Sequence, residues 1–246
     1  MKTKQIFLMF LSIFLVCQTF ITESCKKSKD NSSTYQYGDT VTDIDGNVYH
    51  TIKIGSQVWF QENLAVTHYR NGNPVPFIAD NNQWLTSDSG AYCNYSNDVS
   101  LVTVYGRLYN WYAVNDSRLL SPVGWHIPSD NEWKILEMYL GMSNDQADSV
   151  SYRGTTEGGK LKESGTSHWT TPNTGATNNS GFNGLPGGYR SDTFLEKSTG
   201  GYWWSSSQAS SDEAIFRGLT YDKSGIIRST YHGNETLGLS LRCIKD

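Results

Sequence analysis

Cys93 and Cys243 carry the most versatile side-chain chemistry in the interior of the sequence. A thiol can form a disulfide, bind a metal or act as a nucleophile, and the last two roles require its thiolate form. In a protein exported to an oxidising compartment, two distant cysteines are a candidate disulfide. Two separate buried thiols are the equal alternative, and the sequence leaves both open.

The histidines do not show the spacing of a metal site. They are His50, His68, His126, His168 and His232. None lies at ligand spacing from another or beside a cysteine, so we expect each to be a packed or surface residue. Phosphate-loop, dinucleotide-binding and Gly-x-Ser-x-Gly motifs are also missing from the sequence. We therefore expect no metal, no cofactor and no catalytic residue.

The acidic segment 43–47 has the composition of a calcium loop but not its register. An EF-hand loop has glycine at its sixth position and glutamate at its twelfth. Counted from Asp43, Gly46 is fourth and Ile54 is twelfth. The segment is therefore predicted to be a turn that precedes a strand.

Aromatic side chains are the remaining candidates for ligand binding. Exposed rings beside Asn, Ser and Asp can stack on sugars while their polar edges bond hydroxyl groups. The candidates in such segments are Trp84, Trp169, Tyr202, Trp203 and Trp204. The alternative, which the sequence favours for most of them, is that these rings form the core. Adjacent strand residues point to opposite faces, so one of Trp203 and Trp204 can be exposed.

The N-terminus predicts export. Lys2 and Lys4 precede an uncharged stretch whose apolar centre spans residues 6–16, the pattern of a secretory signal. The stretch is shorter than the about 20 apolar residues that a spanning helix needs. Alternatives to a lipoprotein signal are an uncleaved helix and a plain signal peptide.

Cys25 is the candidate lipid-attachment site. Ser24-Cys25 directly follows the apolar stretch and resembles the lipobox of bacterial lipoproteins. The resemblance implies acylation of Cys25 and stable attachment to a membrane. We expect a signal peptide at 1–25, a flexible polar tether at 26–34 and a single domain at 35–246. The domain would be lipid-anchored in the cell envelope, at the outer membrane, with the periplasmic or surface face left open.

The charge balance limits the class of partner. The chain has 20 basic and 24 acidic residues, and removal of residues 1–25 takes away Lys2, Lys4 and Glu23. The remaining net charge is −5. Nucleic acid and anionic bilayer surfaces bind basic proteins by electrostatic attraction, so neither is expected as the main partner.

Two main helices are predicted. Tyr105, Leu108, Tyr109 and Tyr112 have helical spacing, which predicts a helix over 104–114. A second helix starts at Ser129, where Ser129 and Glu132 form a capping box and Gly141 ends the helix. Ser143 and Gln146 repeat the capping pattern for a short helix over 143–150.

Short strands and long loops account for the rest of the domain. Strands are predicted at 47–54 and 57–60, around a Gly55-Ser56 turn, and at 214–220 and 225–230. Leu237, Leu239, Leu241 and Cys243 alternate with small or polar residues, which predicts a half-buried strand. Residues 166–188 are predicted to be a long ordered loop. The fold class is α+β with small antiparallel sheets.

Several segments together resemble one known family. They are Asp45–Tyr49, Ile54–Trp59, Glu62–Leu64, Tyr105–Ala113, Gly124–Trp133, Gly181-Phe182, Leu185–Arg190, Tyr202–Ser206 and Ser240–Cys243. The family is the Fibrobacter succinogenes major paralogous domain, found in surface and secreted proteins of Bacteroidetes and Fibrobacteres. The resemblance covers residues 40–245.

The resemblance implies a fold more than an activity. The family is similar to the C-type-lectin-like fold, in the branch of the formylglycine-generating enzymes, and implies that fold here. The oxidase chemistry of that branch needs two redox-active cysteines near the C-terminal sheet. Only Cys243 lies there, with Cys93 far away in sequence. The resemblance therefore implies no established activity.

Three functional hypotheses follow. The first is an envelope-anchored lipoprotein that displays a non-catalytic binding module, with a glycan or a surface protein as its ligand. The second is an enzyme with a dispersed site in the same fold. The third is a structural subunit of a surface assembly. The aromatic candidates favour the first.

Overall fold

The computed structural model describes residues 36–230 and 234–246. The expected signal peptide with Cys25, the expected tether 26–34, and His232 lie outside the described residues. Residues 34–246 form one compact unit. In the described part of the chain, no helix combines the length and the apolar character needed to cross a membrane.

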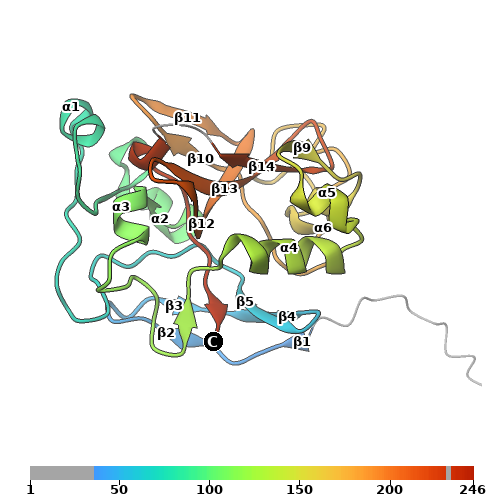
Figure 1. The fold of residues 1–246 in the computed structure, drawn as a ribbon, viewed down its shortest axis with the longest axis horizontal. Coiled ribbons are helices and arrows are strands. Elements are labelled where there is room, and N and C mark those ends of the chain that lie inside the picture. The colour runs from blue at the N-terminus through green and yellow to red at the C-terminus, as the bar shows by residue number, and fades with distance from the viewer. Residues whose placement is uncertain (1–35, 231–233) are drawn as a thin grey trace, which may run out of the picture. The chain divides into compact units, whose positions relative to one another are not determined.

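One sheet has five strands and contains both ends of the described chain (Figure 1). Its order is β1 (Gln36–Tyr37), β4 (Thr51–Ile54), β5 (Gln57–Phe60), β15 (Ile244–Lys245) and β8 (Trp125–His126). The predicted hairpin of β4 and β5 is confirmed, with Gly55 at φ +62° in its turn. Within the predicted strand 47–54, His50 separates β4 from β3 (Val48–Tyr49), and β3 pairs instead with β2 (Val41–Thr42).

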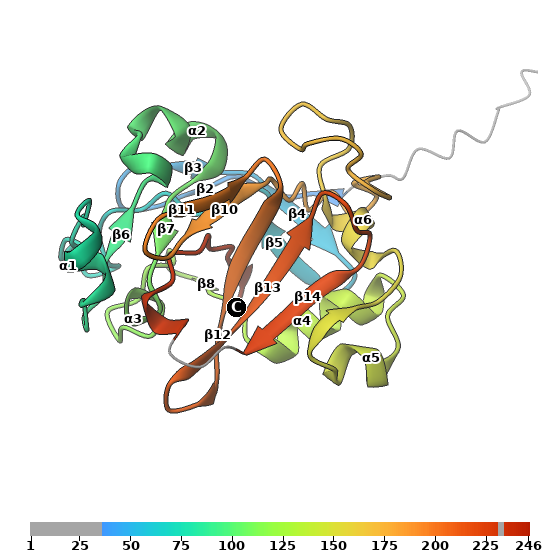
Figure 2. The ribbon, with the colours of Figure 1, turned by 90° about the horizontal axis from the view of Figure 1, so that it is seen from above.

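The second sheet has six strands, seen side by side in Figure 2. Its order is β11 (Phe194–Lys197), β10 (Gly187–Arg190), β12 (Gly200–Ser210), β13 (Glu213–Thr220), β14 (Ile226–Thr230) and β9 (Ser151–Arg153). The neighbours pair antiparallel except β10 and β12, which are parallel. The strands predicted at 214–220 and 225–230 are thus confirmed as β13 and β14.

The helices are short except for one. They are α1 (Asn81–Leu85), α2 (Val102–Tyr105), α3 (Trp111–Val114), α4 (Asp130–Tyr139), α5 (Asn144–Asp148) and α6 (Glu157–Leu161), with 3-10 turns at Tyr95–Asn97, Val99–Leu101 and Asn234–Thr236. The capping boxes predicted at Ser129 and Ser143 are both present. The α+β class is confirmed.

Helix α4 contacts both sheets. Its Trp133 lies 4.9 Å from the ring of Trp59 in β5, and its Glu137 bonds to Arg217 in β13. Trp133, Leu136 and Leu140 are buried, as the predicted stripe requires. The core therefore lies on both faces of the six-stranded sheet, with α4 covering one of them.

The predicted helix over 104–114 is wrong. Gly106 has φ +71° and ends α2, and Leu108–Tyr109 forms strand β7, which pairs with β6 (Tyr92–Cys93). A Cβ at Gly106 would lie 2.7 Å from Cβ of Asn63, so the backbones approach too closely for a side chain. The helical spacing of the aromatics thus arises from a turn and a strand, and α4 is the one long helix among the described residues.

The C-terminal strand is also not half-buried. Gly238, Leu239 and Ser240 make single bridges to Arg190, Tyr109 and Trp203 before β15 joins the other sheet. The segment passes from one sheet to the other, so both of its faces are covered and residues 238–244 are buried (Figure 1).

Candidate ligand-binding site

Four of the five aromatic candidates are part of the core. Trp84, Trp169, Trp203 and Trp204 are at most 1% exposed. Their indole N–H groups donate to interior acceptors, namely Thr236 O, Gly184 O, Asn63 Oδ1 and Tyr109 O. Since neither face of these rings reaches solvent, the prediction that they contact a ligand is wrong. The alternative, that they form the core, holds for all four.

Tyr202 is different because it lines a cavity. The cavity has a volume of about 290 Å³ and lies on the face of the six-stranded sheet opposite α4. We call it the tyrosine pocket; it is lined by Tyr189, Ser191, Glu196, Tyr202, Phe216, Ser229, Leu237 and Leu239. Its size is near the lower end of small-molecule sites.

Strand register explains why these side chains meet. Tyr202 and Trp204 share one face of β12, while Trp203 points to the other. Opposite them on β13 stand Gly218 and Phe216. A Cβ at Gly218 would lie 2.7 Å from the ring of Tyr202, so the glycine leaves room for that ring against the sheet.

The rings of the pocket stand edge to face. The ring centroids of Tyr189 and Tyr202 are 5.2 Å apart, with an interplanar angle of 79°. Those of Tyr202 and Phe216 are 6.3 Å apart, with an interplanar angle of 71°. The ring of Trp204, which belongs to the core, packs against Phe216 with ring centroids 5.9 Å apart and an interplanar angle of 89°. Because each ring is held by the next, the pocket walls are fixed before any ligand binds.

Glu196 brings a charge to the pocket. It precedes the turn from β11 to β12 and has φ +61°, a conformation uncommon for a residue with a side chain. The hydroxyl of Tyr202 donates to its carboxylate. Burial, this hydrogen bond and the negative charge of Glu196 raise the pKa of Tyr202 far above its usual range. Tyr202 therefore remains a neutral donor.

The sequence pointed to only one wall of this pocket. Tyr189 and Phe216 are half-buried aromatics whose meeting depends on the parallel pairing of β10 with β12 and the antiparallel pairing of β12 with β13. The alternation Tyr202-Trp203-Trp204 was the available signal for which ring faces the pocket. Nothing in the sequence pairs Glu196 with Tyr202.

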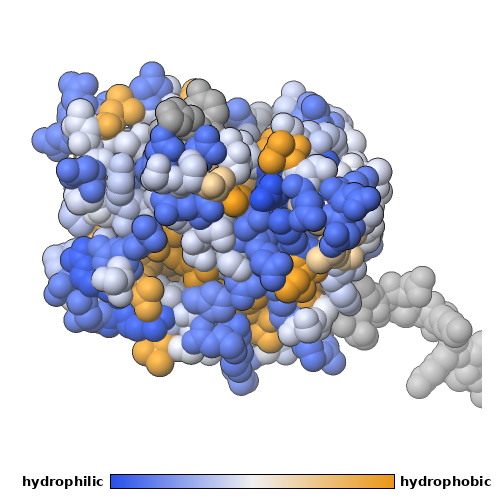
Figure 3. Space-filling view, in the orientation of Figure 1, coloured by the Kyte–Doolittle hydropathy of each residue, from blue (hydrophilic) through white to orange (hydrophobic). Residues whose placement is uncertain are grey.

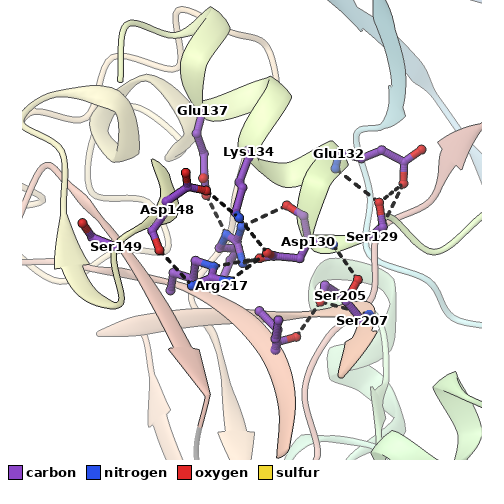
Figure 4. Close-up of polar contacts among 12 residues, drawn as sticks. Ser129, Asp130, Glu132, Lys134, Glu137, Asp148, Ser149, Ser205, Ser207 and Arg217 are labelled. Atoms are coloured by element: carbon purple, nitrogen blue, oxygen red, sulfur yellow. Dashed lines mark hydrogen bonds and ion pairs between the residues drawn. The ribbon is translucent and has the colours of Figure 1, made fainter. Parts of the chain in front are cut away.

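A separate cluster of charges, which the sequence pattern does not reveal, is buried between α4 and the six-stranded sheet. Glu137 accepts from Arg217 at 2.6 Å and from Arg153 at 2.7 Å. Arg228 bonds both oxygens of Asp130 at 2.8 Å (the Asp130–Glu137–Arg217 part is in Figure 4). Ion pairs of 2.6–2.9 Å link the two carboxylates to the three guanidinium groups, which makes the cluster a structural ion network.

Burial alone would raise the pKa of Asp130. Hydrogen bonds from Arg228 and the charge of Arg217 outweigh that effect and hold the pKa well below its usual range. Asp130 is thus ionised at neutral pH.

The cysteines are free thiols, both fully buried. Of the two alternatives for Cys93 and Cys243, the structure contains the unbonded pair rather than the disulfide. Burial raises the pKa of Cys93 to about 11, and it raises that of Cys243 further. Neither thiol has the depressed pKa of a nucleophile.

The described histidines and the acidic turn at 43–47 form no metal site. His50, His68, His126 and His168 each lie beside a carboxylate. The described residues contain no group of three or more His, Cys, Asp or Glu side chains able to hold a metal. Asp43 accepts from the amides of Asp45 and Asn47 and from the hydroxyl of Tyr49. The carboxylate is used within its own loop, so the predicted turn is confirmed.

Four of the segments that carry the family resemblance meet at one buried point. Asn63 Oδ1 accepts from Trp203 Nε1 at 2.8 Å and from Arg242 Nε at 2.7 Å. Arg242 also donates to the carbonyls of Phe60 and Phe182. A family model for the Fibrobacter succinogenes major domain matches residues 52–245. The chain belongs to the Fibrobacter succinogenes major domain family.

Two other comparisons return nothing. No curated protein and no solved structure matches the chain. Among the residues of the Fibrobacter succinogenes major domain motifs, Asn63, Trp203 and Arg242 hold the fold together, and Tyr189 and Tyr202 line the pocket. Membership of the family therefore accounts for the scaffold and assigns no ligand to the pocket.

Proposed function

We propose that this protein is an envelope-anchored lipoprotein that displays a non-catalytic binding module, with the tyrosine pocket as its ligand site. The pocket carries this proposal: it combines pre-positioned aromatic rings with two serine hydroxyls and one carboxylate. Such a site offers apolar faces and polar edges together, which suits a sugar ring or a similar amphipathic group. Glycans are accordingly the proposed ligand class.

The face of the molecule shown in Figure 3 favours a confined site over a broad apolar interface. Figure 3 shows one face on which apolar areas are scattered among hydrophilic ones. Large continuous apolar patches are typical of protein or membrane contacts. A small pocket in a polar surface favours a small ligand or one residue of a larger one.

The thiol chemistry weighs against an oxidase of the formylglycine-generating type. That chemistry needs thiolates, whereas burial raises the pKa of both Cys93 and Cys243. Cys93 packs with Trp84 and Leu108, and Cys243 belongs to a different core cluster. The pair therefore lacks the exposure that a redox site needs.

The C-type-lectin-like assignment belongs to the same proposal. Its support is that the first and last strands share one sheet and that a long loop, residues 162–186, precedes the second sheet's β10. Lipid anchoring rests on Ser24-Cys25 together with the basic residues and the apolar stretch that precede it. Radiolabelled palmitate should label the wild type and not Cys25→Ala, and equal labelling would refute the anchor.

A glycan array tests the ligand site. The full chain, purified in a non-ionic detergent, should bind a subset of glycans, and Tyr189→Ala should abolish that binding. Tyr139→Ala is the matched control, since Tyr139 is 64% exposed on α4 and lies outside the pocket. An array without binders, or binding that survives Tyr189→Ala, would overturn the glycan site.

A further inference from the structure

The charge of the tyrosine pocket sets a condition on its ligand. Of its eight lining residues, one is charged, and that residue is Glu196. No lysine or arginine lines the cavity. The carboxylate has one hydrogen bond within the described residues, from the hydroxyl of Tyr202. A neutral hydroxyl does not cancel its charge.

Acidic side chains around the pocket add to the negative charge of Glu196. Asp192 and Glu196 act electrostatically on Tyr189, and Glu196 and Asp222 act on Tyr202. Each of these groups works in the same direction as burial and raises the pKa of the tyrosine it faces. The charged side chains that act most strongly on the two pocket tyrosines are therefore acidic.

The aromatic rings of the pocket also attract a positively charged ligand. The faces of Tyr and Phe rings are negative because of their quadrupole, and they attract a cation placed over them. Tyr189, Tyr202 and Phe216 supply three such rings around one cavity. A ligand that covers Glu196 without bringing a positive charge would leave a carboxylate desolvated and unpaired, which is costly.

We propose that the tyrosine pocket selects a ligand bearing an ammonium group, which lies against the three rings and pairs with the carboxylate of Glu196. This inference deepens the proposed function and rests on it. A free organic ammonium group and a glycan with an unacetylated amine share the required chemistry. A neutral sugar meets the aromatic requirement but not the charge.

Two matched probe pairs separate these possibilities. Choline and 3,3-dimethylbutan-1-ol have the same shape and differ by one charge. Glucosamine and glucose differ by one amine on the same ring. Binding of each to the full chain is measured by saturation-transfer NMR titration. Choline is expected to bind about tenfold or more tightly than its neutral isostere. If the ammonium group belongs to an amino sugar, glucosamine should bind more tightly than glucose. If it belongs to a free organic ammonium compound, only choline should bind.

Variants locate the effect. Glu196→Gln should weaken choline binding about tenfold and leave the isostere unchanged, and Asp192→Asn should weaken it less. Tyr189→Leu should abolish binding of both. Asp145→Asn, which removes an exposed carboxylate on α5, is the charge-matched control and should change nothing. The urea midpoint of each variant shows whether it folds. If Glu196→Gln does not fold, Asp192→Asn still tests whether the acidic charge matters for binding.

The outcomes distinguish the two proposals. Equal binding of charged and neutral probes, both lost in Tyr189→Leu, would overturn the cation selectivity while leaving the ligand site intact. Binding that survives Tyr189→Leu would overturn both, as would failure of every probe to bind.

Discussion

The Nε atom of Arg217 in β13 donates to Oε1 of Glu137 in α4 at 2.6 Å, and neither side chain is more than 1% exposed. Arg153 from β9 binds the other carboxylate oxygen. One glutamate thus joins the long helix to two strands of the six-stranded sheet. The face of that sheet opposite the tyrosine pocket is held by this network.

Glu137→Gln should destabilise the domain by about 3–5 kcal/mol, because it leaves the buried guanidinium group of Arg153 without its counter-charge and removes one of the two carboxylates that pair with Arg217. That is a large share of a typical stability of about 5–15 kcal/mol. Urea unfolding followed by tryptophan fluorescence measures it. Glu213→Gln, at the start of β13 and outside the network, is the control. A loss below about 0.5 kcal/mol, the scale of a neutral surface change, would contradict a structural role.

Acid should unfold the domain partly through Asp130. Its pKa is depressed in the folded state, since Arg228 and Arg217 outweigh the effect of burial. Its stabilisation is therefore fully present above the unfolded value of about 4 and is lost as pH falls below that value. The urea midpoint measured from pH 7 to pH 3 should fall. Asp130→Asn should be less stable at pH 7 and should flatten this dependence, whereas Asp145→Asn should keep the wild-type slope.

How far the sequence predicted the fold depended on the range of each interaction. Ser129 and Glu132 lie three residues apart, so their capping box was visible in the sequence and is present. The helix expected over 104–114 failed because its spacing could not show that Gly106 packs against Asn63. Local hydrogen bonding was predictable, and contacts across 40 or more residues were not.

The candidate site was predictable only in part for the same reason. Aromatic content alone cannot separate Tyr202 from Trp203, because burial is decided by what covers each face of β12. Glu196 became a site residue through the turn that leads from β11 into β12. Its position relative to Tyr189 depends on strand pairing, which the sequence does not reveal.

The long polar loop should lose its order if Lys162 is replaced. The Nζ atom donates to the carbonyls of Thr174, Thr220 and Lys223 at 2.8–3.0 Å. Burial lowers the pKa of Lys162 to about 8, which still leaves an ammonium group with three protons at neutral pH. Lys162→Met would leave three carbonyls without donors, each costing about 1–3 kcal/mol if it stays buried.

Hydrogen exchange tests this loop directly. In Lys162→Met, the amide of Thr174, which donates to Tyr221, should exchange faster than in the wild type. Lys53→Met on β4, whose side chain is exposed, is the matched control and should leave that amide protected. Unchanged protection in Lys162→Met would mean that the loop is ordered by its other contacts.

His126 should titrate at a higher pH than a free histidine. Burial lowers its pKa, but hydrogen bonds with Asp246 at 2.7 Å and Glu132 at 2.8 Å outweigh that effect and raise it. The ring between two carboxylates joins the C-terminal residue to the start of α4. Because the folded pKa is raised, this stabilisation is present below the unfolded value of about 6.5 and is lost as pH rises through the folded value.

NMR titration of the His126 ring proton gives the folded pKa, which should exceed 6.5. Glu132→Gln should lower it, and so should removal of Asp246, since each takes away one of the two carboxylates. The ring is 39% exposed, so the gain in stability is expected to be below about 1 kcal/mol. Glu163→Gln, which changes the partner of His168 instead, should leave the titration of His126 unmoved. A His126 pKa at or below that of a free histidine would show that burial outweighs the two carboxylates.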